Sequence, residues 1–351
     1  MNNIERLISI YKRLHNKTLL QGDYKMKYAF VGIGSHSVNN LYPVLDYLHV
    51  PLKYICCKST SKVELIRKRV GVTATVTLDD IIDDDEVGGV FVSVSPDAHY
   101  DIAKKVLESG KSLFIEKPPC RSVEELRSLA EIAEKSNVRT VLVGVQKRYA
   151  PVTCIISRKL VKLGCVSYNM RYQTGLYPEG DPLLDLFIHP LYYVCFLFGR
   201  AEIYAVDCVR HGGSGMTLLL ILKHRNARGV LELSTYYTWR SAKEELTVNA
   251  KDGIYELEQM ESLKFTPKPG AVFGIPMEKV CRNYRPITVD LFGRNNFVPI
   301  LANNQIYMQG YFNEIKTFVD LVEGKNFKGC NSSFRSLDAT FELIDGLRKV
   351  I

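Results

Sequence analysis

Short apolar runs alternate with amphipathic stretches between Met26 and about residue 150. The runs are rich in β-branched and aromatic residues, whereas the stretches between them repeat apolar residues at helical spacing. Strands are predicted at 28–33, 52–57, 73–76, 90–94, 112–115 and 140–145, and helices at 62–70, 97–108 and 123–135. Because strict strand–helix alternation with continuously apolar strands is typical of a parallel sheet covered on both faces, residues 26–150 are predicted to form a doubly wound α/β domain of the Rossmann type.

The pattern changes after Pro151. A helix is predicted at 152–163, an apolar segment follows at 183–198, and closely spaced strands are predicted at 202–209, 217–223, 229–237 and 245–249. Glycine-rich turns separate these strands, and helices return at 311–322 and 334–351. Residues 151–332 are therefore predicted to be an α+β domain with a mostly antiparallel, open sheet, in which the stretch 265–305 is irregular.

Residues 1–25 precede the first strand as a separate unit. Ile4, Leu7, Ile8 and Tyr11 repeat at the spacing of an amphipathic helix. Because a strand begins directly after Met26, this helix is predicted to be an extension in front of a complete domain. Docking on its own protein or on a second subunit is the favoured role, and membrane contact is the alternative.

Composition narrows the class of protein. The chain has 351 residues, enough for about two domains, and 46 % hydrophobic with 24 % charged residues are values of a globular enzyme. Purely apolar runs such as 218–222 are far shorter than the roughly 18 residues of a membrane span. A soluble protein without a membrane partner is expected.

Cysteine and charge usage point to a compartment and a type of ligand. Nine cysteines, an odd number without a C-x-x-C pair, favour free thiols in the cytoplasm over disulfides or a metal site. The net charge of +8 is not concentrated in one basic run, so nucleic acid is not an expected partner. An anionic small-molecule substrate explains the positive charge better.

A glycine turn follows the first strand. Gly32 and Gly34 precede a helical stretch, and Ser37 stands at the third small position. Such a turn needs glycine for its bend and for close approach of a pyrophosphate, so it predicts dinucleotide binding rather than an ordinary strand–helix turn. His36 either approaches the cofactor or is a loop histidine without a role.

The end of the second strand bears on the choice of cofactor. NAD sites usually have an acidic residue here for the ribose 2′-hydroxyl, but this chain has Lys58, Ser59 and Thr60. A base and hydroxyls suit a 2′-phosphate, which favours NADP over NAD. A surface lysine followed by a helix cap is the alternative.

Later strands end in further polar runs. Ser95 and Pro96 make a good helix start, and capping alone could explain them. Lys117 stands at the carboxyl end of a predicted parallel strand, the edge where ligands bind in such sheets.

Three runs in this order after the glycine turn carry a resemblance to a known family. They are Ser95-Pro96 with His99, Glu116-Lys117-Pro118, and Gly144-x-x-x-Arg148-Tyr149-x-Pro151. Together they resemble the Gfo/Idh/MocA oxidoreductases, a family named for glucose-fructose oxidoreductase and inositol dehydrogenase. The resemblance covers nearly the whole chain from Met26, and it implies that the C-terminal helix, residues 333–351, returns onto the Rossmann domain.

The resemblance also implies site residues in the second domain. The family has an Asp-x-x-x-His motif with a histidine in acid–base catalysis, and Asp185 and His189 match it. A buried, purely structural pair is the alternative reading. Pro190 fits the first turn of a helix, where the dipole favours a neutral imidazole. The family often continues with an acid three residues after the histidine, where this chain has Tyr192.

The predicted function is NADP- or NAD-dependent hydride transfer to or from a hydroxyl or ketone carbon of a sugar, cyclitol or nucleotide sugar, in carbohydrate metabolism. The alternatives are a nucleotide-sensing regulator and a redox-neutral lyase or hydrolase with bound NAD. A homodimer or homotetramer through the second-domain sheet is expected. Lys117, His189 and Asp185 are the expected catalytic residues. The cofactor is expected to contact Gly32, Ile33, Gly34, Ser35, His36, Ser37, Lys58, Ser59, Thr60, Ser95, Pro96, His99, Glu116 and Lys117. The substrate is expected to contact Lys117, Arg148, Tyr149, Tyr172, Asp185 and His189.

Overall fold

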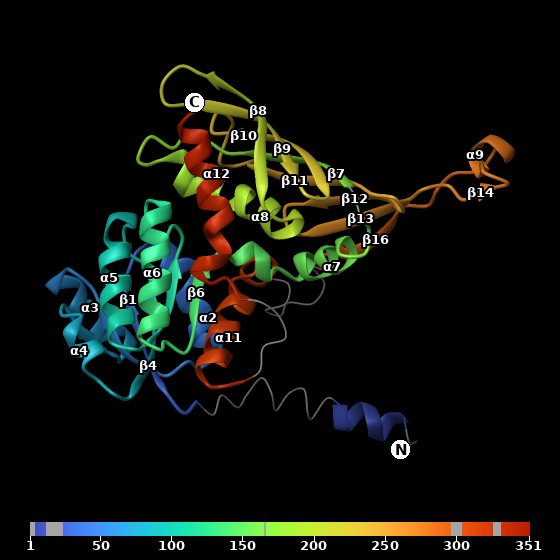
Figure 1. Cartoon of the computed structure of the whole chain (residues 1–351). Coiled ribbons are helices and arrows are strands. Elements are labelled where there is room, and N and C mark those ends of the chain that lie inside the picture. Colours follow the sequence, from blue (N-terminus) through green and yellow to red (C-terminus); the bar gives the residue numbers. More distant parts are fainter. Residues whose placement is uncertain (1–3, 12–23, 165, 296–303, 326–330) are drawn as a thin grey trace. The chain divides into compact units, whose positions relative to one another are not determined.

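The structure is a computed structural model that describes residues 4–11, 24–164, 166–295, 304–325 and 331–351. The chain divides into two compact units (Figure 1). The first consists of residues 1–119, 128–144 and 314–333, and the second of residues 120–127, 145–313 and 334–351.

The first unit contains a six-stranded parallel sheet, which confirms the predicted doubly wound fold. Its strands are β1 (Lys27–Val31), β2 (Leu52–Cys56), β3 (Thr73–Thr75), β4 (Val87–Val92), β5 (Ser112–Glu116) and β6 (Val141–Gly144), in the order β3-β2-β1-β4-β5-β6. The order reverses between β1 and β4, and in open α/β sheets ligands bind outside the carboxyl ends of the strands at such a reversal. The connecting elements are η1 (Ser37–Leu41), α2 (Tyr42–Tyr47), α3 (Thr60–Val70), α4 (Asp79–Ile82), α5 (Pro96–Glu108) and α6 (Val123–Lys135).

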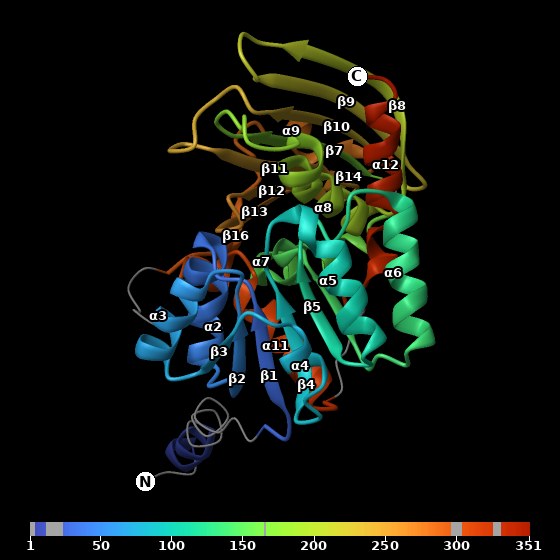
Figure 2. The same cartoon turned by 90° about the vertical axis from the view of Figure 1, so that its left-hand side faces the viewer.

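Helices cover both faces of this sheet. Helices α5 and α6 lie on one face, and α2 and α11 (Tyr311–Val322) lie on the other (Figures 1 and 2). Phe318 of α11 packs edge-on against Phe91 at 5.0 Å and Phe114 at 5.8 Å between ring centroids, and all three side chains are fully buried. Burial of each such ring stabilises the fold by about 1.5–3 kcal/mol.

The helix that returns to the first unit comes earlier in the chain than predicted. Residues 314–333, which include most of α11, belong to that unit. The C-terminal helix α12 (Asp338–Arg348) instead packs against α8 (Ile188–Phe198) and β8 (Ala201–Arg210) of the second unit. The amphipathic pattern identified both helices, but it does not say which sheet a helix covers.

The second unit is built on an eight-stranded sheet, mostly antiparallel as predicted. Its order is β16-β13-β12-β11-β7-β10-β9-β8, and β7 and β10 form its parallel pair. The remaining strands are β7 (Val166–Gln173), β9 (Met216–His224), β10 (Ala227–Ser234), β11 (Lys243–Asn249), β12 (Gly253–Glu258), β13 (Ser262–Pro267) and β16 (Val289–Gly293). Helix α7 (Pro151–Leu160), the π-helical turn η3 (Pro182–Phe187) and α8 belong to the same unit. Short elements β14 (Ala271–Val272), β15 (Ile275–Pro276), α9 (Met277–Val280), α10 (Gln305–Met308) and η5 (Phe334–Leu337) complete it.

The sequence pattern missed one strand of this sheet, and it misjudged a second stretch. Strand β7 was not predicted, because its buried Val166, Tyr168 and Met170 alternate with polar residues that resemble a loop. The stretch 265–305 is not wholly irregular, since it contains the end of β13 and the whole of β16, which pair at the sheet edge. The segment 296–303 lies outside the described residues.

The N-terminal extension contains the predicted helix in part. Residues 4–11 form a helix, and residues 1–3 and 12–23 lie outside the described part. Among the described helices, none has the length and apolarity to cross a membrane.

Candidate active site

The glycine turn after β1 depends on the absence of side chains at two positions. Gly32 has φ +111°, and a Cβ atom there would lie 1.9 Å from the carbonyl oxygen of Ser93. A Cβ on Gly34 would meet nothing within 4 Å, so the space above this residue is open. The hydroxyl of buried Ser37 accepts from the Gly34 amide at 2.9 Å and donates to its carbonyl at 3.0 Å. Serine at the third small position therefore closes the turn itself.

A pocket of about 580 Å³ surrounds this turn. Residues 32–37, which are the whole predicted turn, line it together with Lys58, Ser59 and Ser95. Lys62, which was not predicted, also lines the pocket, and its ammonium donates to the carbonyl of Ile33 at 3.2 Å. It lies in the first turn of α3, directly after the predicted run of Lys58, Ser59 and Thr60, and this closeness in sequence was the available signal. The pocket lining contains no acidic side chain.

The side chain of His99, a predicted cofactor residue, connects two of the polar runs. It is buried, and it is not among the residues that line the pocket. Its Nδ1 lies 2.7 Å from the carbonyl oxygen of Pro118, and its Nε2 accepts from the Val94 amide at 3.3 Å. Since a carbonyl only accepts and an amide only donates, the ring is neutral with its proton on Nδ1. His99 therefore joins the loop after β4 to the Glu116-Lys117-Pro118 run.

Glu116 connects the same run to the glycine turn. Its carboxylate lies 3.2 Å from Nε2 of His36, and it also accepts from the Lys117 amide at 3.3 Å. Burial lowers the pKa of His36, but the hydrogen bond and charge of Glu116 outweigh burial, so the pKa is raised above its usual value. Gly144 faces Glu116 on the neighbouring strand, and a Cβ there would lie 2.9 Å from the carboxyl carbon. The glycine therefore makes room for the carboxylate.

Three other predicted cofactor residues lie near the pocket without lining it. Thr60 is the first residue of α3, Pro96 is the first residue of α5, and Lys117 follows β5. The bond between Lys117 and Pro118 is cis.

In the second unit, the predicted Asp185 and His189 lie where η3 passes into α8. Asp185 is buried, and Oδ2 of its carboxylate accepts from the Asp181 amide at 3.0 Å and from the Tyr177 hydroxyl at 3.4 Å. His189 is half-buried in α8, directly before Pro190. The sequence predicts a helix start here, but η3 leads into α8 without a break, and Asp181 is the N-cap of the joined segment. His189 therefore lies about two turns inside the helix, beyond the first turn in which the helix dipole acts.

Asp181 supports this turn. One carboxylate oxygen accepts from the Leu183 amide at 2.9 Å, and the other pairs with Arg348 of α12 at 2.6 Å. Asp181 therefore caps the helical segment that carries the predicted catalytic pair.

Arg148 and Tyr149, two of the predicted substrate residues, have different surroundings in the structure. A guanidinium nitrogen of Arg148 donates to the hydroxyl of Tyr192 at 2.7 Å, and the guanidinium stacks on Phe196 at 4.6 Å. Tyrosine thus accepts a hydrogen bond from Arg148 at the position where the family often has an acid. Tyr149 is only 5 % exposed and lies two residues before α7.

A buried ion pair near Tyr172 was not predicted. Lys147 and Glu244 are both buried, with 2.5 Å between the ammonium and the carboxylate, and the ammonium lies 4.7 Å from the centre of the Tyr172 ring. Burial lowers the pKa of Lys147, but the charge of Glu244 outweighs it and the pKa is raised. Because 97 residues separate the partners, no local pattern could reveal the pair.

Removing Glu244 should destabilise the fold strongly. Glu244→Ala leaves the Lys147 ammonium buried without this carboxylate, and breaking a buried pair costs about 3–5 kcal/mol. Glu245→Ala is the matched control, because the neighbouring carboxylate pairs with Arg171 at the surface and such pairs contribute about 0–1 kcal/mol. Urea unfolding measures both free energies. Equal losses in the two variants would contradict the importance of the buried pair.

Comparisons with known proteins show which proteins this chain resembles in sequence and fold. Residues 26–145 match the model of an oxidoreductase family with an NAD-binding Rossmann fold. An inositol 2-dehydrogenase/D-chiro-inositol 3-dehydrogenase of Lactiplantibacillus plantarum is 25 % identical over 44 % of this chain and 45 % of its own length. An inositol 2-dehydrogenase of Rhizobium meliloti is 22 % identical over 70 % of this chain and 74 % of its own length. The chain thus spans less than half of the Lactiplantibacillus relative that it matches.

The fold as a whole has solved counterparts. A dehydrogenase structure from Chromobacterium violaceum superposes with a TM-score of 0.75 at 16 % identity, covering 93 % of this chain and 95 % of the other. In the described residues, no cluster of three or more histidine, cysteine or acidic side chains is arranged to hold a metal ion.

Proposed function

We propose that the protein transfers hydride between a nicotinamide and a hydroxyl or ketone carbon of a sugar, cyclitol or nucleotide sugar, because residues 26–145 match the model of the Gfo/Idh/MocA oxidoreductase family. The inositol dehydrogenases among the relatives support a cyclitol or sugar as the substrate class.

The contact between His36 and Glu116 is the observation that carries the proposal. The glycine turn bears His36, and Glu116 directly precedes Lys117. The contact therefore brings the E-K-P lysine to the same edge of the parallel sheet as the dinucleotide pocket. An ammonium at that place serves a reaction at the nicotinamide end of a cofactor better than it serves nucleotide sensing alone.

The residues divide the chemistry between them. A bound nicotinamide supplies or accepts the hydride. For oxidation of an alcohol, an imidazole nitrogen of His189 takes the hydroxyl proton, and Asp185 positions His189 and stabilises its protonated form. The ammonium of Lys117 donates a hydrogen bond to the oxygen on which negative charge develops. Arg148 and Tyr172 contact the other hydroxyls of the substrate.

A substrate screen tests the proposal. The protein is mixed with NAD, NADP or their reduced forms and with cyclitols, sugars and nucleotide sugars, and nicotinamide absorbance is followed. We expect turnover with at least one cyclitol or sugar. Cofactor binding without turnover of any of these would favour a sensing regulator, and product formed without net absorbance change would favour a redox-neutral lyase or hydrolase.

The preferred cofactor is proposed to be NADP. Lys58, Ser59 and Lys62 line the pocket beside the end of β2, and the lining has no acid to repel a 2′-phosphate. NADP should therefore bind more tightly than NAD, and Lys58→Asp should weaken NADP binding more than NAD binding. Lys68→Asp makes the same charge change on the exposed side of α3, outside the pocket lining, and should change neither. Calorimetric titration measures all the constants. Tighter NAD binding by the unaltered protein would contradict the assignment.

A second copy of the chain is proposed to cover the outer face of the eight-stranded sheet, giving a homodimer or homotetramer. Leu219, Ile221 and Val230 form an exposed apolar patch across β9 and β10, where Val230 lies opposite Ile221. Such patches on a sheet face favour association. Light scattering should show an oligomer, and Ile221→Arg should dissociate it. Glu64→Arg, at an exposed position of α3 in the first unit, is the control and should leave the oligomer intact. A monomeric unaltered protein would contradict the proposal.

A further inference from the structure

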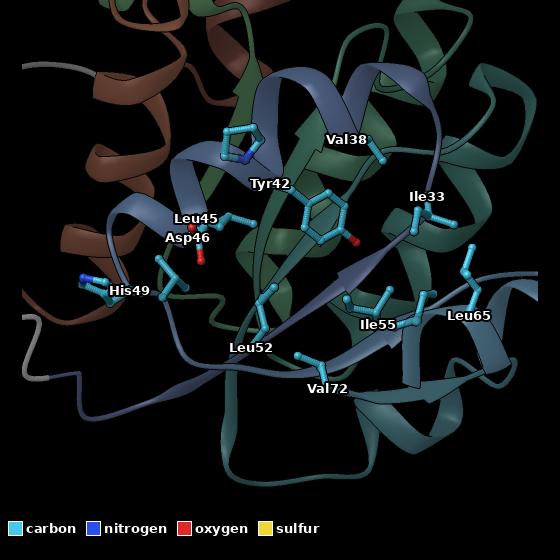
Figure 3. Close-up of a pocket in the computed structure, with 13 residues that line it drawn as sticks. Ile33, Val38, Tyr42, Leu45, Asp46, His49, Leu52, Ile55, Leu65 and Val72 are labelled. Atoms are coloured by element: carbon cyan, nitrogen blue, oxygen red, sulfur yellow. The ribbon is translucent and has the colours of Figure 1, made fainter. Parts of the chain in front are cut away.

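The first unit has a second, apolar pocket, which shares Ile33 with the dinucleotide pocket and otherwise has a different lining. Its volume is about 780 Å³, and it lies between α2, β2 and α3 (Figure 3). Val38 and Tyr42 approach it from the helix after the glycine turn, Leu52 and Ile55 from β2, and Leu65 from α3 (Figure 3). Apart from Tyr42, the polar residues of its lining are Asp46 and His49.

Part of this lining is exposed to water. Val38 is 48 % exposed and Leu65 is 47 % exposed. Each Å² of apolar surface removed from water contributes about 25 cal/mol, so an apolar segment placed here would gain stability from the pocket.

The N-terminal helix has the complementary property. The side chains on one of its faces, Ile4, Leu7, Ile8 and Tyr11, are between 49 % and 68 % exposed. Isolated helices shorter than about 12–15 residues are marginal in water, and most helical stability in proteins comes from packing of the apolar face. A helix over residues 4–11 therefore needs a surface to pack on.

Residues 24–26, which follow the N-terminal extension, are held beside the pocket. The hydroxyl of Tyr24 donates to the carbonyl of Leu48 at 2.5 Å, next to His49 of the pocket lining. The amides of Lys25 and Met26 donate to the Glu323 carboxylate at 2.8 and 3.3 Å, which fixes this part of the backbone. Twelve residues connect the helix to Tyr24 and can span up to about 40 Å.

From these observations we propose that the helix of residues 4–11 docks its apolar face into the pocket between α2, β2 and α3 of its own chain. A short connection gives the helix an effective concentration in the millimolar range at its own pocket, which favours this pocket over that of a second copy. The docked helix covers Leu65 and Val38, and it touches Tyr42, whose hydroxyl donates to the Gly32 carbonyl at 3.3 Å. The extension is thus assigned to the back of the glycine turn.

Cross-linking tests the place of docking. A photoreactive benzoylphenylalanine replaces Leu7 in the full chain, which keeps a large apolar side chain there. Protein labelled with ¹⁵N and unlabelled protein are unfolded together, refolded and irradiated, and cross-linked peptides are identified by mass spectrometry. We expect position 7 to join peptides of α2, β2 or α3 in pairs of one isotope. Pairs that mix the isotopes would assign the helix to a second copy, and cross-links to other elements would assign it elsewhere; either result overturns the proposal.

Charge substitutions on both surfaces provide an independent test. Leu7→Asp on the helix and Leu65→Asp in the pocket should each lower amide-exchange protection of residues 4–11 at least about tenfold, because each places a charge in the contact. Ser9→Asp adds the same charge to the opposite face of the helix and should leave protection unchanged. Leu65 is half exposed, so its substitution leaves the fold intact, which the melting temperature checks. Unchanged protection in Leu65→Asp would overturn the proposal.

Discussion

His189→Ala should lower kcat at least about tenfold while cofactor affinity stays nearly unchanged. A positioned base contributes about 10²- to 10⁴-fold to a step in which a hydroxyl proton leaves as a carbonyl forms, and alanine removes that base. His189 belongs to the second unit, whereas the dinucleotide pocket is lined by residues of the first, so cofactor binding does not depend on its ring. Steady-state kinetics on the substrate found by screening, with calorimetric titration of the cofactor, measures both effects.

Two further variants complete this test. Lys117→Ala should also lower kcat at least about tenfold, since it removes the donor to the developing oxyanion. His211→Ala is the control, because His211 lies on the same unit and bonds to Thr217 far along the chain from the predicted pair. If His189→Ala and Lys117→Ala both kept full turnover, the assigned site would be wrong and the regulator hypothesis would gain.

Alanine at the two glycines of the turn should have two different effects. Gly32→Ala should lower the free energy of unfolding by at least about 2 kcal/mol, because its Cβ would collide with the Ser93 carbonyl at a strained φ. Gly34→Ala should leave that free energy unchanged, since its Cβ meets nothing within 4 Å. It should nevertheless weaken cofactor binding at least about tenfold, because the backbone there is where a pyrophosphate approaches.

Urea unfolding and cofactor titration of both variants measure these effects. The informative comparison is Gly34→Ala, which folds normally in this account. Normal cofactor affinity in a folded Gly34→Ala protein would show that the open space above Gly34 is not where the pyrophosphate lies.

Features set by local periodicity were predictable from the sequence. The helices at 123–135 and 311–322 have their predicted bounds, because their apolar residues repeat regularly and face one side. The parallel sheet of the first unit was predictable as well, since strict alternation of strands and helices is typical of parallel strands. The glycine turn was also recognisable, because its chemistry is contained in a few adjacent residues.

Features set by contacts between distant residues were not predictable. Gly144 is part of a recognisable run, but its purpose, room for the Glu116 carboxylate, exists only because β5 and β6 are neighbours. The partner of Lys147 lies 97 residues away, and the buried position of His99 depends on the Pro118 carbonyl of another loop.

Isotope transfer tests the central claim, hydride transfer to a nicotinamide, most directly. The substrate found by screening is prepared with deuterium on the carbon that bears the reacting hydroxyl, and the reduced cofactor is analysed by mass spectrometry after turnover. The account predicts that each reduced nicotinamide carries one deuterium from the substrate. Reduced nicotinamide without deuterium, formed while the substrate is oxidised, would contradict it.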